Sequence, residues 1–174
     1  DFCGGSKPYL LTEVDNNLGA TTRIHYTSST RFQVAATTAG RPWVTTLPFP
    51  VHVVERVDKI DHIGRTHLVS TYEYHHGYYD GAEREFRGFG RVDQSDTEAF
   101  DRLGAPPGST NVDASFYAPP VVTRTWFHTG AANDDAISLR LEAEYYRDTG
   151  GAPLHLGDSV LQGVESAAER RQAL

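Results

Sequence analysis

The sequence predicts a mainly β protein, an antiparallel, twisted sheet of long hairpins followed by a short C-terminal helical segment. β-prone runs in the N-terminal half alternate apolar and polar side chains with the period of two that marks half-buried strands. Clusters of turn-forming residues separate these runs. Near the C-terminus, Ser166-Ala167-Ala168-Glu169 matches a helix capping box. We therefore expect a sheet over residues 1–130 and a mixed helical segment over residues 131–174.

The first predicted hairpin pairs Tyr9–Val14 with Ala20–Thr27. Between them, Asp15-Asn16-Asn17-Leu18-Gly19 supplies residues that readily adopt turn and left-handed conformations. A second, longer hairpin pairs Val51–Asp61 with His67–His75 around a turn at residues 62–65. These two hairpins account for the first four predicted strands.

The predicted strand Glu83–Gln94 contains an irregularity. Its apolar residues recur at every second position and so lie on one face of the strand. Phe89, between Gly88 and Gly90, falls on the opposite face. Two glycines beside an out-of-phase aromatic residue predict a bulge or a close approach of another backbone. A further strand is expected over Val121–Phe127.

Two segments depart from the hairpin pattern. Leu47-Pro48-Phe49-Pro50 should be an extended edge or connector, because proline has no N–H to donate to a central strand. In Ile137–Arg147 the apolar residues alternate as in a strand, but the composition and part of the spacing favour a helix, which we predict. A second helix should begin at Ala167 and run to Leu174.

Composition limits the classes of function. A net charge of −7 argues against nucleic acid as the main partner, and no apolar run approaches the length of about 20 residues that crosses a bilayer. The chain has no methionine, and Asp1–Ser6 has no signal-peptide pattern, so we expect a processed or excised piece of a longer protein. The single cysteine, Cys3, excludes an internal disulfide and is either free or paired outside this chain.

A metal site is the first chemical hypothesis. His75, His76 and Asp80 are close in sequence, and His128 is a distant fourth candidate ligand. However, neighbouring residues of a strand point to opposite faces, so His75 and His76 reach one ion only if a turn begins there. A hairpin tip, with Gly77, Asp80 and Gly81 supplying the turn, is the preferred interpretation.

Paired acids are the second hypothesis, with Glu83/Glu85 and Asp134/Asp135 as candidates for general acid–base catalysis. Arg84 and Arg87 interleave with the first pair, which favours surface ion pairing. No G-x-S-x-G motif is present, and Gly88-Phe89-Gly90 is too short for a phosphate loop. We predict no enzyme, no cofactor, and no catalytic, cofactor-binding or metal-binding residue.

Aromatic residues allow a third hypothesis. Tyr78, Tyr79 and Trp43 are candidates for stacking on sugars, which would make the chain a carbohydrate- or receptor-binding β module. Packing between strands is the more common role of such residues in β proteins.

Several motifs together resemble a known family. They are Tyr72–Gly81, Glu83–Val92, Lys7–Leu11 with Asp15–Gly19, Gly40–Trp43, Leu47–Val51, Trp126–Gly130 and Glu144–Arg147. In their joint order they resemble the middle region of the B component of Tc (toxin complex) toxins, insecticidal proteins related to virulence-plasmid toxins and Rhs/YD-repeat proteins.

The resemblance implies a structural segment of a secreted bacterial toxin-delivery shell. Its implied partners are the C component, the effector enclosed by the shell, and the A-component pore, which is reached through a neighbouring propeller. No contact of this segment with a membrane is implied, and no catalytic residue carries over. In such a shell, Tyr72, Tyr74, Phe86 and Phe89 would form an aromatic ladder. Alone, the segment should cover its sheet edges by homo-oligomerising or with its C-terminal helix.

Overall fold

The computed structural model describes residues 9–98, 119–131, 137, 140, 141, 143 and 144. The chain divides into two compact units, Asp1–Asn133 and Asp134–Leu174. The first unit contains all the strands and the one helix described below. Among the described residues, no helix has the length and apolar character needed to cross a bilayer.

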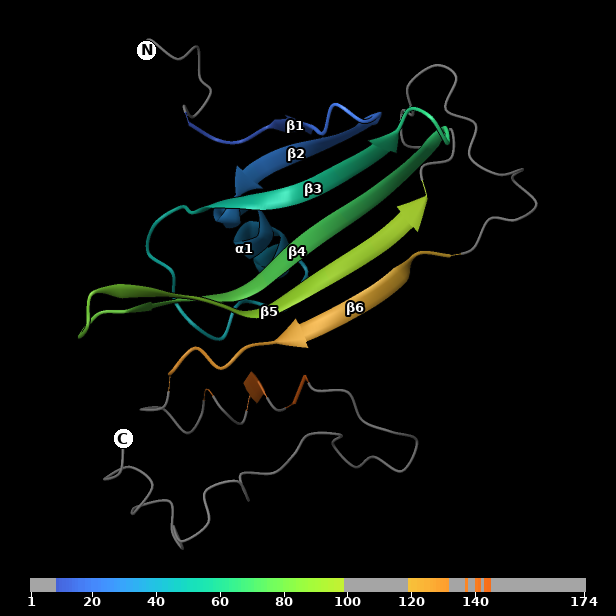
Figure 1. The fold of residues 1–174 in the computed structure, drawn as a ribbon. Coiled ribbons are helices and arrows are strands. Elements are labelled where there is room, and N and C mark those ends of the chain that lie inside the picture. The colour runs from blue at the N-terminus through green and yellow to red at the C-terminus, as the bar shows by residue number, and fades with distance from the viewer. Residues whose placement is uncertain (1–8, 99–118, 132–136, 138–139, 142, 145–174) are drawn as a thin grey trace, which may run out of the picture. The chain divides into compact units, whose positions relative to one another are not determined.

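The first unit is built on one six-stranded antiparallel sheet (Figure 1). Each strand pairs with the next strand in the sequence, so the sheet is a meander in the order β1-β2-β3-β4-β5-β6. This arrangement confirms the prediction of a mainly β, antiparallel fold. The strands are β1 (Glu13–Asp15), β2 (Ala20–Ser28), β3 (His52–Asp61), β4 (Thr66–Asp80), β5 (Glu85–Glu98) and β6 (Val121–Trp126).

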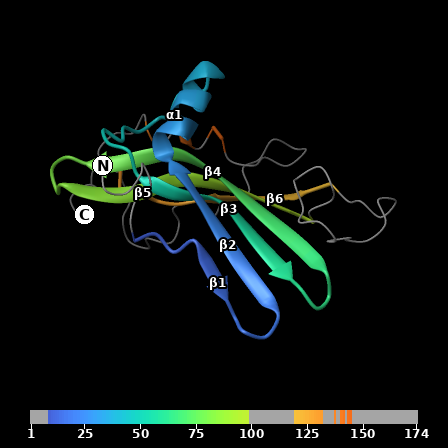
Figure 2. The same cartoon turned by 90° about the horizontal axis from the view of Figure 1, so that it is seen from above.

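The helix α1 (Ser29–Thr38) follows β2 directly and lies on one face of the sheet (Figure 2). It was not predicted, because its sequence carries no marked apolar stripe and Val34 is exposed. Its ends nevertheless carry recognisable signals. The Ser28 hydroxyl accepts a hydrogen bond from Thr30 N–H, and Gly40 follows the last turn with a φ of 72°.

Contacts from its first turn fix α1 on the sheet. The Phe32 ring packs against Tyr74 of β4 at a centroid distance of 5.6 Å, and Arg31 forms an ion pair with Glu55 of β3. At the start of the helix, buried Ser29 exchanges two hydrogen bonds with Val51, one through its backbone N–H and one through its hydroxyl.

Strand β4 is longer than predicted and continues to Asp80. The predicted turn role of Gly77 is therefore wrong, because this glycine is buried inside the strand. The turn comes later, where the Asp80 carboxylate accepts hydrogen bonds from the backbone N–H groups of Ala82 and Glu83. At the other end of the sheet, β1 has only three residues where the sequence predicted a strand over Tyr9–Val14.

The predicted irregularity in β5 is a bulge. Tyr78 pairs with Gly88 and Tyr79 pairs with Phe86, which leaves Arg87 as the extra residue. Gly88 has a φ of 95°, in the left-handed region that a residue without Cβ adopts at least cost. Because the bulge shifts the alternation by one residue, the Phe86 ring meets Phe89 at a centroid distance of 5.6 Å.

Aromatic rings form the main packing cluster of this unit. Ring contacts run from Phe32 to Tyr74, from Tyr74 to Phe89, and from Phe89 to Trp43 and Phe86. Three members of the predicted ladder, Tyr74, Phe86 and Phe89, thus belong to the cluster. The remaining contacts lead from Phe86 to Phe49 and from Phe49 to Tyr79.

The connector, residues 41–50, runs along β4 and supplies part of this cluster. The prediction of a connector over Leu47–Pro50 is confirmed, since no strand is formed there. Trp43, Thr45 and Leu47 alternate as buried residues, which is the pattern of an extended segment with one face packed. The Thr45 hydroxyl donates to the Gly77 carbonyl at 3.0 Å, and Tyr79 N–H donates to the Thr46 carbonyl at 3.1 Å.

In the second unit, Ile137, Arg140 and Leu141 are helical and Ala143 and Glu144 form a turn. The rest of Ile137–Arg147 and all of Ala167–Leu174 lie outside the described residues. Both C-terminal helices therefore stay predictions.

We predict that Gly77→Ala destabilises the fold by about 1–3 kcal/mol, because overpacking a filled site forces its neighbours apart. A Cβ at Gly77 would lie 2.7 Å from the Trp43 ring and 2.8 Å from a Leu47 methyl group. The matched control is Gly81→Ala, since a Cβ at that turn position meets nothing within 4 Å. Urea unfolding followed by circular dichroism measures both variants, and equal stabilities would contradict the packing described for the connector.

Candidate functional site

The structure separates the histidines that suggested a metal site. The rings of His75 and His76 are 6.1 Å apart between centroids, and His76 Nδ1 accepts a hydrogen bond from Val44 N–H at 3.0 Å. His128 lies beyond the end of β6, where its Nδ1 accepts from Gly130 N–H at 3.2 Å. In the part of the chain that the structure describes, no three His, Cys, Asp or Glu residues are grouped as metal ligands.

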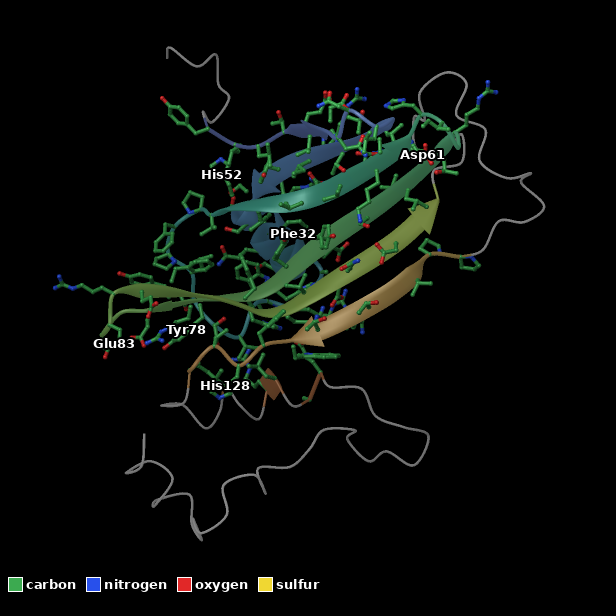
Figure 3. The ribbon with its side chains drawn as sticks, viewed as in Figure 1. Phe32, His52, Asp61, Tyr78, Glu83 and His128 are labelled. Atoms are coloured by element: carbon green, nitrogen blue, oxygen red, sulfur yellow. The ribbon has the colours of Figure 1, made fainter. Side chains whose placement is uncertain are left out.

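The acidic pairs also separate. Glu83 lies in the exposed β4–β5 turn, at the end of the sheet opposite Asp61 (Figure 3). Glu85 forms an ion pair with Arg87 at 3.3 Å, and Arg87 also lies 3.7 Å from Asp80. The charged residues at this hairpin tip therefore form surface ion pairs, which is the interpretation that the sequence favoured. Asp134 and Asp135 lie outside the described residues, as does Cys3.

Two of the three aromatic candidates, Trp43 and Tyr79, pack against other rings. Trp43 is 8% exposed and packs edge-on against Phe89, which agrees with the packing role preferred over sugar stacking. Tyr79 packs against Phe49 with the two rings nearly perpendicular, at 5.1 Å between centroids. These residues hold the connector on β4, which is the packing role that the sequence analysis considered more common.

The most organised polar site is a cluster around Asp58, which the sequence analysis missed. Asp58 is 3% exposed and receives contacts from three side chains on β2, β3 and β4. His67 Nε2 lies 2.6 Å from Asp58 Oδ1, and His25 Nε2 lies 3.0 Å from Asp58 Oδ2. Arg56 donates to Oδ1 from Nε at 3.1 Å and from Nη2 at 2.6 Å.

Electrostatics favour the charged form of Asp58. Burial alone raises the pKa of this carboxyl, but hydrogen bonds from Arg56 and His67, with their positive charges, outweigh burial and hold the pKa below its ordinary value. Both carboxylate oxygens are engaged by neighbouring side chains. The cluster thus joins three strands around one anion, and its geometry suits a structural role.

A second cluster repeats this arrangement around Asp93 of β5. Arg91 Nε lies 3.0 Å from Asp93 Oδ1, while Arg124 Nε of β6 lies 3.2 Å from Oδ2. His75 of β4 approaches Oδ2 at 3.8 Å. Like the first cluster, this one joins three neighbouring strands around a single carboxylate.

A signal for both clusters is present in the sequence. The tripeptide Arg-Val-Asp occurs at residues 56–58 and again at residues 91–93. In a strand, the first and third residues of such a tripeptide share a face, which brings the guanidinium beside the carboxylate. The histidine partners come from other strands, so the sequence alone does not reveal them.

Comparison with known proteins identifies the family. Residues 4–130 match the family described as the insecticide toxin TcdB middle/N-terminal region. The chain belongs to this family. The resemblance to Tc toxin B components is therefore confirmed.

Solved structures of Tc toxins contain the same fold. The chain is 38% identical to a chain in the crystal structure of TcdB2-TccC3, with a TM-score of 0.65, and to one in TcdB2-TccC3-Cdc42, with a TM-score of 0.66. The Tc holotoxin pore of Photorhabdus luminescens, carrying a TccC3 mutation, matches with the same identity and a TM-score of 0.64. Each match covers 82% of this chain and 6% of the other chain. No curated protein matches the chain.

Within this TcdB middle/N-terminal segment, a third carboxylate is also bound by its neighbours. Asp96 of β5 accepts a hydrogen bond from the Ser70 hydroxyl at 2.5 Å and from the Gln94 amide at 2.8 Å. These two hydrogen bonds lower the pKa of Asp96. The three carboxylates at Asp58, Asp93 and Asp96 thus bind side chains of the sheet itself, and they link adjacent strands.

We predict that Asp58→Asn destabilises this segment by about 2–4 kcal/mol at pH 7, because it removes the anion that pairs with Arg56 and the two histidines. A lowered folded-state pKa gives stability that is present above the unfolded pKa of about 3.9 and is lost as pH falls through the folded value.

The difference in unfolding free energy between parent and variant should therefore narrow only in acid below about pH 4. Urea unfolding between pH 7 and pH 3 measures it. Glu83→Gln, which removes an exposed carboxylate in the turn, is the control and should change stability by less than about 0.5 kcal/mol. A loss in Asp58→Asn no larger than the control, or a gap independent of pH, would refute the proposed role of this carboxylate.

Proposed function

We propose that this chain is a non-catalytic structural segment of a Tc B component, part of a secreted shell that helps to enclose a cytotoxic effector. The observation that carries the proposal is the match at 38% identity, over 82% of this chain, to TcdB2 in complexes with TccC3. The chain spans 6% of the chains that it matches, so the shell and its activity belong to a much larger protein.

The side-chain arrangement supports a structural role. The aromatic cluster and the connector pack against each other across β4 and β5, and the Asp58 and Asp93 clusters each join three strands. A segment of a shell needs strands held in a defined register and bent at defined positions. Side-chain clusters across strands supply the first requirement, and the bulge at Gly88 supplies the second.

The proposed partners follow from the family. The C component and its enclosed effector would be the direct partners, as the pairing of TcdB2 with TccC3 suggests. The A-component pore would be reached through a neighbouring propeller, a relation supported by the match to a holotoxin pore. We propose no cofactor, no nucleic-acid partner and no membrane contact for this segment. As an isolated fragment it is proposed to cover its edges by homo-oligomerising.

The proposed organisation has a sheet segment over residues 1–130 and a mixed helical segment over residues 131–174. Its support is the boundary between the two compact units, which lies between Asn133 and Asp134. The sheet segment would form part of the shell.

We predict that protection of the effector follows the stability of this segment. In a complete B component co-expressed with its C component, Gly77→Ala should loosen the connector and expose the effector to protease. A destabilisation of about 1.4 kcal/mol raises the population of open states about tenfold. The measurement is the rate of effector cleavage by an added protease in the purified complex.

Gly81→Ala is the matched control and should leave the cleavage rate unchanged, since its Cβ enters open space.

A second comparison tests the absence of catalysis. His25→Gln and His75→Gln change half-exposed or partly exposed members of the ion clusters. If either variant abolished toxicity while the shell kept its stability and its protected effector, a purely structural role would be wrong.

A further inference from the structure

His76 occupies an unusual position inside β4. It is 3% exposed, and its φ of 57° is left-handed, a conformation that costs most residues about 1–2 kcal/mol. Gly90 of β5 faces it closely, because a Cβ at that glycine would lie 3.2 Å from the His76 Cβ. The imidazole is therefore confined between the connector and β5.

The hydrogen bond to the connector defines the state of this ring. Val44 N–H donates to His76 Nδ1 at 3.0 Å, and a backbone N–H has no acceptor role. Nδ1 must therefore present its lone pair, so the proton of the neutral ring lies on Nε2. A second proton would have to enter at Nδ1. Protonation and the hydrogen bond from Val44 compete for the same lone pair.

We propose that His76 is a pH-sensitive latch, which holds the connector on β4 when its ring is neutral and releases Val44 when Nδ1 is protonated. Release of Val44 would free the N-terminal end of the connector first. The remaining connector contacts, from Thr45 to the Gly77 carbonyl and from Tyr79 to the Thr46 carbonyl, involve no ionisable side chain.

Ionisable side chains of β4 and β5 lie near His76. The connector contributes one ionisable side chain, the exposed Arg41 at its start. On β4 the neighbouring ionisable group is His75, at 6.1 Å between ring centroids. On β5 the nearby groups are Asp93, which His75 approaches at 3.8 Å, and Arg91, which pairs with His75 in the register and binds Asp93. His75 lies on the Asp93 side of the strand, and the hydrogen bond from Val44 goes to His76.

Amide hydrogen exchange on the full 174-residue chain tests the latch. Histidine in an open chain binds a proton near pH 6.5, so local opening at Val44 should increase about tenfold per pH unit below that value. Between pH 6.5 and pH 4.5, the protection of the Val44 amide, corrected for intrinsic exchange, should fall about fiftyfold. Amides of β3 report global opening, which also frees His76, so their protection should fall by no more than that of Val44.

The variant His76→Asn distinguishes pH dependence caused by the His76 ring from pH dependence of the fold as a whole. Asparagine tolerates the left-handed backbone, and its side-chain oxygen accepts from Val44 N–H without titrating. The variant should lose the pH dependence at Val44. The matched control, His75→Asn on the adjacent residue, should retain it.

Three outcomes overturn the proposal: a flat profile in the parent chain, an equal fall in His76→Asn, or a flat profile in His75→Asn. Should His76→Asn fail to fold, nitrogen chemical shifts of the His76 ring in the parent chain decide the same question. At pH 7.5 they should show a neutral ring with its proton on Nε2, and a proton on Nδ1 would exclude the latch. This inference concerns the fold and stands independently of the proposed function.

Discussion

The close packing of the connector on Gly77 is the constraint on which the rest of the fold depends. The absence of a side chain at this position lets Trp43 and Leu47 approach the backbone of β4. Once they are in place, Trp43 meets Phe89, Phe89 meets Tyr74, and Tyr74 meets Phe32 of α1. A segment between two strands thereby joins the helix, the connector and the β4–β5 pair into one packed cluster, although most of its rings are only partly buried.

Polar clusters complement this limited apolar packing. Among the described residues, the buried hydrophobic side chains are Trp43, Leu47, Val53, Ile60 and Val69. A buried ion pair adds little net stability, because desolvation offsets most of the Coulomb attraction, but leaving one partner unpaired is costly. A register shift between β3 and β4 would separate Asp58 from His67 and incur that cost. The carboxylate clusters therefore specify the pairing of strands more than they stabilise the folded state.

The alternation of apolar and polar residues predicted most of the strands, and the glycines flanking Phe89 predicted the bulge. The helix α1 was missed because its packing depends on Phe32 and on caps at Ser28 and Gly40, whereas a periodic apolar stripe is absent. The end of β4 was misplaced because His-His-Gly resembles a turn, and His76 does adopt a turn-like φ of 57° while remaining in the strand. The Asp58 cluster needs His25 and His67 from two other strands, and no local pattern reveals such long-range pairing.

The positions that carry the resemblance to Tc toxin B components connect structure with function. The two longest motifs, Tyr72–Gly81 and Glu83–Val92, cover the part of β4 and β5 where His76, Gly77, Gly88 and Gly90 occur. In the structure these residues set a left-handed strand position, a close contact with the side chains of the connector, and a bulge. Each of these three features determines the path of the backbone. The ionisable side chains near them pair with one another. A segment whose most characteristic residues determine the path of two strands is suited to form part of a shell, because the curvature of that shell depends on where its strands bend.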